Sequence, residues 1–136
     1  MDRKLSEPSA YVDELARNVI SAAIEVHRNL GPGFFEAVYE ESLCVELKSR
    51  NIFFERQKKF DIYFKDSLVG EGRIDLLIDN NLIVELKAVE VLAPIHFAQV
   101  TSYLKAMKLQ LALLINFNVP LLKEGIKRII NSIHSK

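Results

Sequence analysis

The chain lacks the features of secreted and membrane-spanning proteins. Among its 136 residues there is one cysteine, Cys44, which cannot build a disulfide framework and suits a reducing cytoplasm. The longest apolar runs, such as residues 109–117, are too short to span a bilayer, and this one is interrupted by Gln110 and Asn116. The N-terminus has no basic start followed by an apolar stretch, so we expect no secretory signal and a cytoplasmic protein that does not contact membranes.

The chain also lacks an excess of charge of either sign. Its 18 basic and 18 acidic residues give a formal net charge of zero, which argues against a broad positive surface for nucleic acid. Local basic patches remain compatible with this balance. Two groups of basic residues lie close in sequence: Arg50, Arg56, Lys58 and Lys59, and then Lys123, Lys127 and Arg128. Each group is either a local contact surface or ordinary solvated surface, and we favour the second reading.

No internal repeat, low-complexity tract or linker divides the chain. Residues 1–12 form a polar N-terminal segment, and residues 13–136 are expected to be a single domain with its own core. Apolar periodicity and turn residues predict helices at about 13–29, 34–50 and 94–108. A last helix is expected from Pro120, with a buried stripe of Leu122, Ile126, Ile129 and Ile133. Extended segments are expected at 53–55, 58–64, 72–78, 82–88 and 111–117. This order predicts an α/β domain with a mixed sheet covered by helices on both faces.

Three charged residues stand inside the two central apolar strands, which are joined by a turn at residues 79–81. They are Asp75, Glu85 and Lys87. A charge among Val, Ile and Leu is costly unless it is paired, bound to a metal or exposed. Glu85 and Lys87 are two residues apart, so their side chains leave the strand on the same face. An Asp followed after nine residues by Glu-x-Lys is the layout of a nuclease metal site.

Two carboxylates on adjacent strands can share a divalent cation. Oxygen ligands without a Cys/His cluster indicate Mg²⁺ or Mn²⁺ rather than structural zinc, and such an ion would activate a water and polarise a phosphoryl oxygen. Lys87 would orient or deprotonate that water, or neutralise charge developing on the phosphate. The alternative is an edge strand on which Glu85 and Lys87 simply face solvent.

Two further polar residues are candidates on helices. Glu36 lines up at helical spacing with apparently buried leucines and could point inward, or it could serve only the helix dipole. Gln99 falls in the same stripe as Val100 and Tyr103, so it is either a core amide or faces the cavity of the acidic residues. Spacing leaves both choices open.

For three other reactive side chains we expect structural roles. Cys44 lies within a helical pattern and is predicted to be a packed core thiol. His27 precedes a glycine turn near a helix end, and His96 stands in a first helical turn, where it could cap the helix or reach the cavity rim.

Together these residues resemble a known family. Gly33-Phe-Phe-Glu36-Ala-Val-Tyr39 matches the motif that names the GxxExxY proteins, which belong to the PD-(D/E)XK nuclease-like superfamily. The similarity covers roughly residues 13–131, with further matching stretches at residues 24–33, 83–89, 96–99 and 113–117. One departure is Ile74, which stands where the superfamily name has proline.

The resemblance implies a restriction-endonuclease-like core in the order αβββαβ, a mixed central sheet flanked by helices. It implies that Asp75 and Glu85 bind the metal with the carbonyl of Leu86, and that Glu36 supports the site from the second coordination sphere or on a second ion. It also assigns catalytic roles to Glu36, Asp75, Glu85, Lys87 and Gln99.

The resulting hypothesis is a metal-dependent nuclease that uses a metal-activated water, with DNA as the first choice of substrate and RNA as the second. The alternatives are a binding module that keeps the nuclease fold but does not cleave nucleic acid, and a purely structural partner in a larger complex. The complete set of acids and lysine argues against both, because a non-catalytic protein gains little from buried like charges. A single small domain grips few base pairs, so we also expect that the chain could act as a homodimer.

Overall fold

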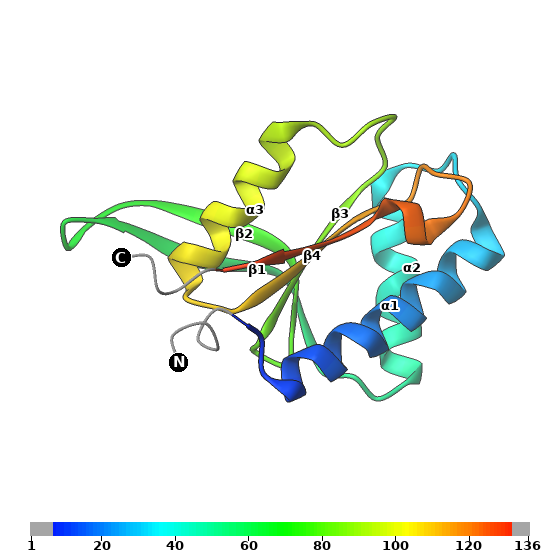
Figure 1. Cartoon of the computed structure of the whole chain (residues 1–136), viewed down its shortest axis with the longest axis horizontal. Helices are drawn as coiled ribbons and strands as arrows, with labels where there is room; N and C mark the ends of the chain where they lie inside the picture. The colour runs from blue at the N-terminus through cyan, green and yellow to red at the C-terminus, as the bar shows by residue number, and fades with distance from the viewer. Residues whose placement is uncertain (1–6, 132–136) are drawn as a thin grey trace.

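The computed structural model describes residues 7–131, which form one mixed sheet flanked by helices (Figure 1). The elements in chain order are α1 (Ala10–Leu30), α2 (Glu36–Ser49), β1 (Phe54–Phe64), β2 (Ser67–Ile78), β3 (Leu82–Lys87), α3 (Pro94–Met107), β4 (Leu111–Asn116), the 3₁₀ helix η2 (Leu122–Gly125) and β5 (Ile126–Ile130). No helix in this part of the chain has the length and apolar character needed to cross a membrane.

The sheet has the strand order β1-β2-β3-β4-β5. The pair β3–β4 is parallel and the other three pairs are antiparallel. Because parallel neighbours need a crossover, α3 connects β3 to β4 over one face, while α1 and α2 lie on the other face (Figure 1). The predicted order of helix, three strands, helix and strand is therefore confirmed in α2-β1-β2-β3-α3-β4, with α1 before it and η2 and β5 after it.

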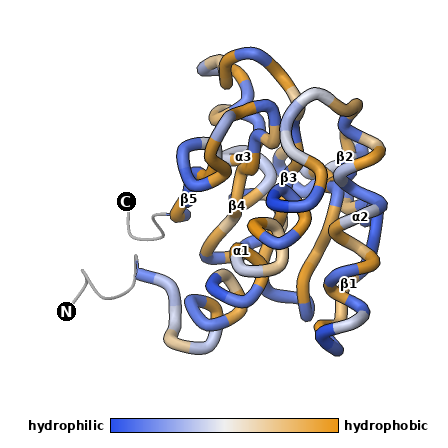
Figure 2. The backbone as a smooth tube through the Cα atoms, turned by 90° about the vertical axis from the view of Figure 1, so that its right-hand side faces the viewer, coloured by the Kyte–Doolittle hydropathy of each residue, from blue (hydrophilic) through white to orange (hydrophobic). Residues whose placement is uncertain are grey.

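The sheet separates two hydrophobic cores. The larger core joins α1 and α2 to one face, and the smaller joins α3 to the other. The central strand β4 is buried at all six positions, which explains its unbroken apolar pattern and its hydrophobic colour through the middle of Figure 2. Burial on both sides fixes β3 and β4 as the rigid centre of the sheet.

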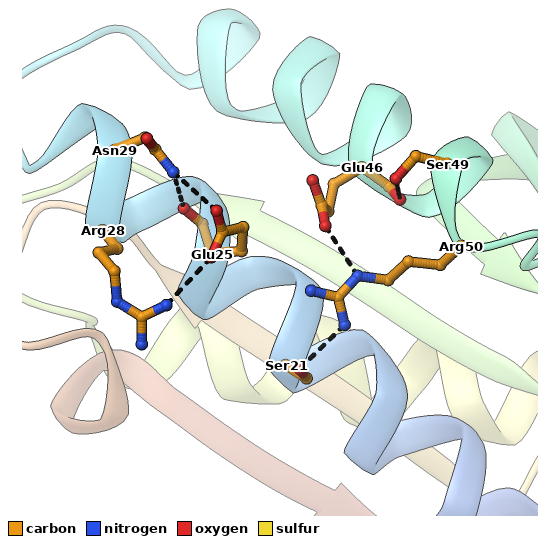
Figure 3. Close-up of polar contacts among 7 residues, drawn as sticks. All are labelled: Ser21, Glu25, Arg28, Asn29, Glu46, Ser49 and Arg50. Atoms are coloured by element: carbon orange, nitrogen blue, oxygen red, sulfur yellow. Dashed lines mark hydrogen bonds and ion pairs between the residues drawn. The ribbon is translucent and has the colours of Figure 1, made fainter.

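Polar contacts tie α1 to α2 outside the core (Figure 3). Arg50, which follows α2, donates to the Ser21 hydroxyl of α1 at 2.9 Å and to the Glu46 carboxylate at 2.8 Å. On α1, Glu25 accepts hydrogen bonds from Arg28 at 3.0 Å and from Asn29 at 3.0 Å. Arg50 thus serves the fold rather than a free basic surface.

The predicted helix after Pro120 is wrong. One turn of 3₁₀ helix, Leu122–Gly125, leads instead into β5, which pairs with β4 from Ile115↔Ile126 to Leu111↔Ile130. Isoleucines spaced three and four apart suit a helix, but β-branched residues also favour strands, and the backbone of β4 needs a partner on this edge. Ile133, the last residue of the expected stripe, lies outside the described residues.

Other element boundaries differ more modestly from expectation. Helix α1 begins at Ala10, three residues earlier than predicted, because the hydroxyl of Ser9 caps it by accepting from the Val12 amide. The extended segments at 53–55 and 58–64 form one strand, β1, with Gln57 as an irregular residue at φ 53°. The register with β2 continues past Gln57, from Arg56↔Leu76 to Lys58↔Ile74, and the shift that marks a bulge lies at Ile62/Tyr63.

Gly125 offers a test of the packing between η2 and the end of β4. A Cβ on this buried glycine would lie 2.1 Å from the carbonyl oxygen of Asn116, so Gly125→Ala must push backbone against backbone. We expect a loss of about 2–3 kcal/mol in the free energy of unfolding, measured by urea denaturation. Gly70→Ala is the matched control, because nothing lies within 4 Å of its added Cβ. Equal stability of the two variants would contradict the close packing at Gly125.

Candidate active site

The candidate site lies where β2 and β3 separate. The two strands pair from Ile78↔Leu82 only as far as Leu76↔Val84. Beyond that point the backbones of β2 and β3 no longer pair, and two carboxylates accept hydrogen bonds from the backbone instead. The Asp75 amide donates to Glu85 Oε2 at 2.7 Å, and the Leu86 amide donates to Asp75 Oδ2 at 2.8 Å. These crossed hydrogen bonds hold the two acids beside each other at the fork.

Burial sets the electrostatics of this acid pair. Glu85 is 5% exposed on β3, an interior strand of the sheet, so the alternative of a solvent-facing edge strand is wrong. Burial, followed by the charge of Asp75, raises the pKa of Glu85 to about 8. Burial also raises the pKa of Asp75, and the hydrogen bond from the Leu86 amide opposes this rise. The fork therefore holds two carboxyl groups that resist simultaneous ionisation.

Lys87 ends β3 as a half-buried residue beside these acids. Its positive charge lowers the pKa of Glu85, of Asp75 and of Glu36, so it acts electrostatically on all three. Glu36, the first residue of α2, is exposed. Partial burial of its carboxyl group raises its pKa, and the charge of Asp75 adds to this effect, but solvent screens the shift more than at Glu85. The structure thus brings Glu36 into the electrostatic reach of the fork without burying it.

Gln99 does not occupy the buried stripe expected for it. It is exposed on α3, whose buried residues are Val100 and Leu104. A hydrogen bond with Gln99 lowers the pKa of Tyr103, while burial, followed by the charges of Glu85 and Asp75, raises it. Gln99 therefore lies next to a tyrosine that is close enough to sense the acid pair.

Gln57 and Glu40 were not placed in the site by sequence reasoning, yet Gln57 contacts Asp75 directly and links it to Glu40. The amide of Gln57 donates to both carboxylate oxygens of Glu40 at 3.0 Å and to Asp75 Oδ1 at 3.3 Å. Glu40 also accepts from Arg56 at 2.8 Å. Glu40 carried a signal, since it follows Glu36 by one helical turn. Gln57 lies opposite Asp75 because β1 and β2 pair on both sides of it, at Arg56↔Leu76 and Lys58↔Ile74.

Asn116 supports the segment that follows Lys87. Its side chain donates to the carbonyl of Val89 at 2.9 Å and accepts from the Val89 amide at 3.0 Å. An asparagine inside the otherwise apolar run of β4 was the available signal, because a buried amide needs such partners. The contact fixes the chain just after the fork.

The other reactive side chains have structural contacts. His27 Nε2 donates to the Val119 carbonyl at 2.9 Å, and His96 Nδ1 accepts from the Ala93 amide at 3.0 Å, which caps α3. Cys44 is a buried free thiol in the core, as predicted.

The basic residues of the two groups named from the sequence mostly form ion pairs or face solvent. Arg56 contacts Glu40 and Glu41, and the other ion pairs formed by these two groups are Arg50–Glu46, Lys58–Glu55 and Arg128–Asp13. These pairings favour ordinary solvated surface over a local contact patch, because acids already neutralise the cations.

The donor set at the fork fits a divalent cation held partly by water. Within residues 7–131, no three His, Cys, Asp or Glu side chains converge closely enough to form a complete protein cage. Mg²⁺ is commonly held by one or two carboxylates while it keeps several waters. Asp75 and Glu85 each accept a hydrogen bond from a backbone amide through one oxygen. Burial, followed by the charge of Asp75, raises the pKa of Glu85, and a bound cation would oppose this rise.

Comparison with known proteins gives one family. The family model described as the PD-(D/E)XK nuclease superfamily matches residues 13–129, most of the chain and all of the elements that form the fork. No curated protein and no solved structure matched the chain.

Proposed function

Because the chain belongs to the PD-(D/E)XK nuclease superfamily, we propose that it is a metal-dependent nuclease that hydrolyses phosphodiester bonds in DNA, with RNA as the second choice. The observation that carries the proposal is the pair of buried acids, Asp75 and Glu85, held together at the fork between β2 and β3. Within the superfamily we assign the chain to the GxxExxY group, which is supported by Gly33, Glu36 and Tyr39 in the spacing of that motif.

Asp75 and Glu85, with the backbone carbonyl of Leu86, would hold Mg²⁺ or Mn²⁺. The ion supplies a Lewis acid for the phosphate and a lower pKa for an attacking water. Lys87 would orient that water or neutralise the charge that develops on the phosphate, because its ammonium group acts on all three acids. Glu36 would support the site from the second coordination sphere or on a second ion.

Gln99 would act through Tyr103 in the proposed site. These two residues are four apart on α3, so their side chains lie on the same side of the helix. Gln57 and Glu40 would hold Asp75 from the opposite side, since the Gln57 amide bridges the two carboxylates. The proposed site is thus supported from α2, from β1 and from α3.

A binding module that keeps this fold without cleaving is the competing function. The burial of Glu85 beside Asp75 argues against it, because a surface that only binds has no need of a costly acid pair in its interior. The proposal further includes a cytoplasmic location, supported by the free thiol of Cys44, and a homodimer, supported by the small size of the domain.

The experiment that tests the proposal compares cleavage of labelled DNA and RNA in Mg²⁺, in Mn²⁺ and in chelator. We expect cleavage of DNA only with a divalent cation, and loss of cleavage in Asp75→Asn, which keeps the size of the side chain. Asp66→Asn, at the turn between β1 and β2, is the control acid. If no substrate is cut under any condition, or if Asp75→Asn cuts as well as the wild type, the nuclease proposal fails.

A further inference from the structure

The loop before α2 displays an aromatic ring to solvent. Phe35 is 86% exposed, the highest value among the large apolar side chains of the described residues. It is also the residue immediately before Glu36, at the helix start. An isolated exposed apolar residue is ordinary, but this one adjoins the proposed site and needs a reason to be held there.

The loop that carries Phe35 is fixed by Tyr39. The Tyr39 hydroxyl donates to the Gly31 carbonyl at 2.5 Å and accepts from the Phe34 amide at 3.2 Å. The Tyr39 ring stacks on Phe117 of the core with 4.5 Å between centroids, and Phe34 packs edge-on against it. Phe35 is therefore presented on a preorganised loop, which lowers the entropic cost of binding something to its ring.

The loop that carries Phe35 lies close to Lys87, at the end of β3. The Tyr39 ring, which fixes this loop, stacks on Phe117, and the Phe117 amide donates to the Lys87 carbonyl at 2.9 Å. In Figure 1 the start of α2 and the chain leaving β3 lie at the same end of the molecule. A polymer whose phosphate reaches the fork would therefore pass near the start of α2, which Phe35 precedes.

The chain has no excess of positive charge with which to bind such a polymer. The formal net charge is zero, and Arg56, Lys58 and Arg128 are each already paired with an acid. Nucleic-acid affinity that does not come from neutralised phosphates must come from other contacts. Stacking of bases on aromatic side chains is the contact that tolerates any sequence.

We propose that Phe35 is a stacking platform for an unpaired nucleobase next to the scissile phosphate. The substrate is then single-stranded or locally unpaired nucleic acid, because bases inside a duplex do not present a free face. This inference rests on the proposed nuclease function and narrows its substrate. It also gives Tyr39 a role as the positioning residue that holds the platform.

The test measures binding in chelator, so that cleavage does not enter. Fluorescence anisotropy of a labelled single-stranded DNA of mixed sequence is compared with that of its fully paired duplex. Phe35→Ala is expected to weaken single-strand binding about 5- to 150-fold, while Phe35→Trp preserves it. Phe53→Ala is the matched control, because Phe53 is 58% exposed at the opposite end of α2 and should leave affinity unchanged.

Three outcomes would overturn the inference. These are unchanged single-strand affinity in Phe35→Ala, equal weakening for single strand and duplex, or a change in oligomeric state showing that a second copy covers the ring. Wild-type cleavage with metal, measured in parallel, separates the two proposals. If the wild type cuts but Phe35→Ala binds normally, the platform alone fails; if binding depends on Phe35 but nothing is cut, the nuclease proposal alone fails.

Discussion

Lys87→Met is expected to lower the rate of metal-dependent DNA cleavage by about 10²- to 10⁴-fold. Methionine keeps an unbranched side chain at the end of β3 but removes the charge. Lys87 is the cation that lowers the pKa of Glu36, of Asp75 and of Glu85 together. Its loss leaves charge that develops on the phosphate without a fixed positive partner, and it makes ionisation of the neighbouring acids still harder.

The measurement is single-turnover cleavage of end-labelled DNA in Mg²⁺ over a range of pH. Lys105→Met is the matched control, because Lys105 is exposed towards the end of α3, and it should cleave like the wild type. Lys87→Arg separates charge from geometry: partial activity would favour neutralisation of charge, whereas complete loss would favour proton transfer. Wild-type rates in Lys87→Met would remove Lys87 from the proposed mechanism.

The sequence predicts the centre of this fold well because each central element has a single physical interpretation. β4 is buried on both faces, so its run of apolar residues has no amphipathic alternative. The segment after Pro120 is different, since spaced isoleucines satisfy a helix and a strand equally. This segment forms strand β5 because it pairs with β4, a long-range contact that no local sequence pattern contains.

The candidate site, too, is predictable from the sequence only in part. Asp75 and Glu85 were visible because charge inside an apolar strand is costly, and the structure brings these two together. The bridging position of Gln57 depends on the pairing of β1 with β2, which places it opposite Asp75, and on its own backbone at φ 53°; neither has a local signature in this sequence. Gln99 was expected to be buried because its spacing matches Val100 and Tyr103, but the rotation of α3 against the sheet exposes it.

Without divalent cations, the free energy of unfolding is expected to fall as pH rises from about 4.5 to about 8. The pKa of Glu85 is raised by burial to about 8, so over this interval the unfolded chain has lost a proton that the folded chain retains. Because the folded state retains this proton, a higher pH shifts the folding equilibrium towards the unfolded state. Each pKa unit corresponds to about 1.4 kcal/mol, so the loss approaches roughly 4–5 kcal/mol, shared with Asp75 because the pair titrates together.

Urea denaturation in chelator at a series of pH values measures this slope. Glu85→Gln should flatten it, because the amide keeps an acceptor for the Asp75 N–H but does not ionise. Glu71→Gln, on the exposed part of β2, should leave the slope as it is in the wild type. A wild-type stability that rises through this pH interval would contradict an uncompensated buried acid at Glu85.

Addition of Mg²⁺ or Mn²⁺ turns the same measurement into a test of metal binding that does not depend on catalysis. A cation held by Asp75 and Glu85 prefers their ionised forms, so it should stabilise the wild type most near pH 8, where it opposes the loss just described. Glu85→Gln removes one of the two donors and should lose most of this stabilisation. If Mg²⁺ and Mn²⁺ raise the unfolding free energy of wild type and Glu85→Gln equally, the ion binds elsewhere and the acid pair is not its site.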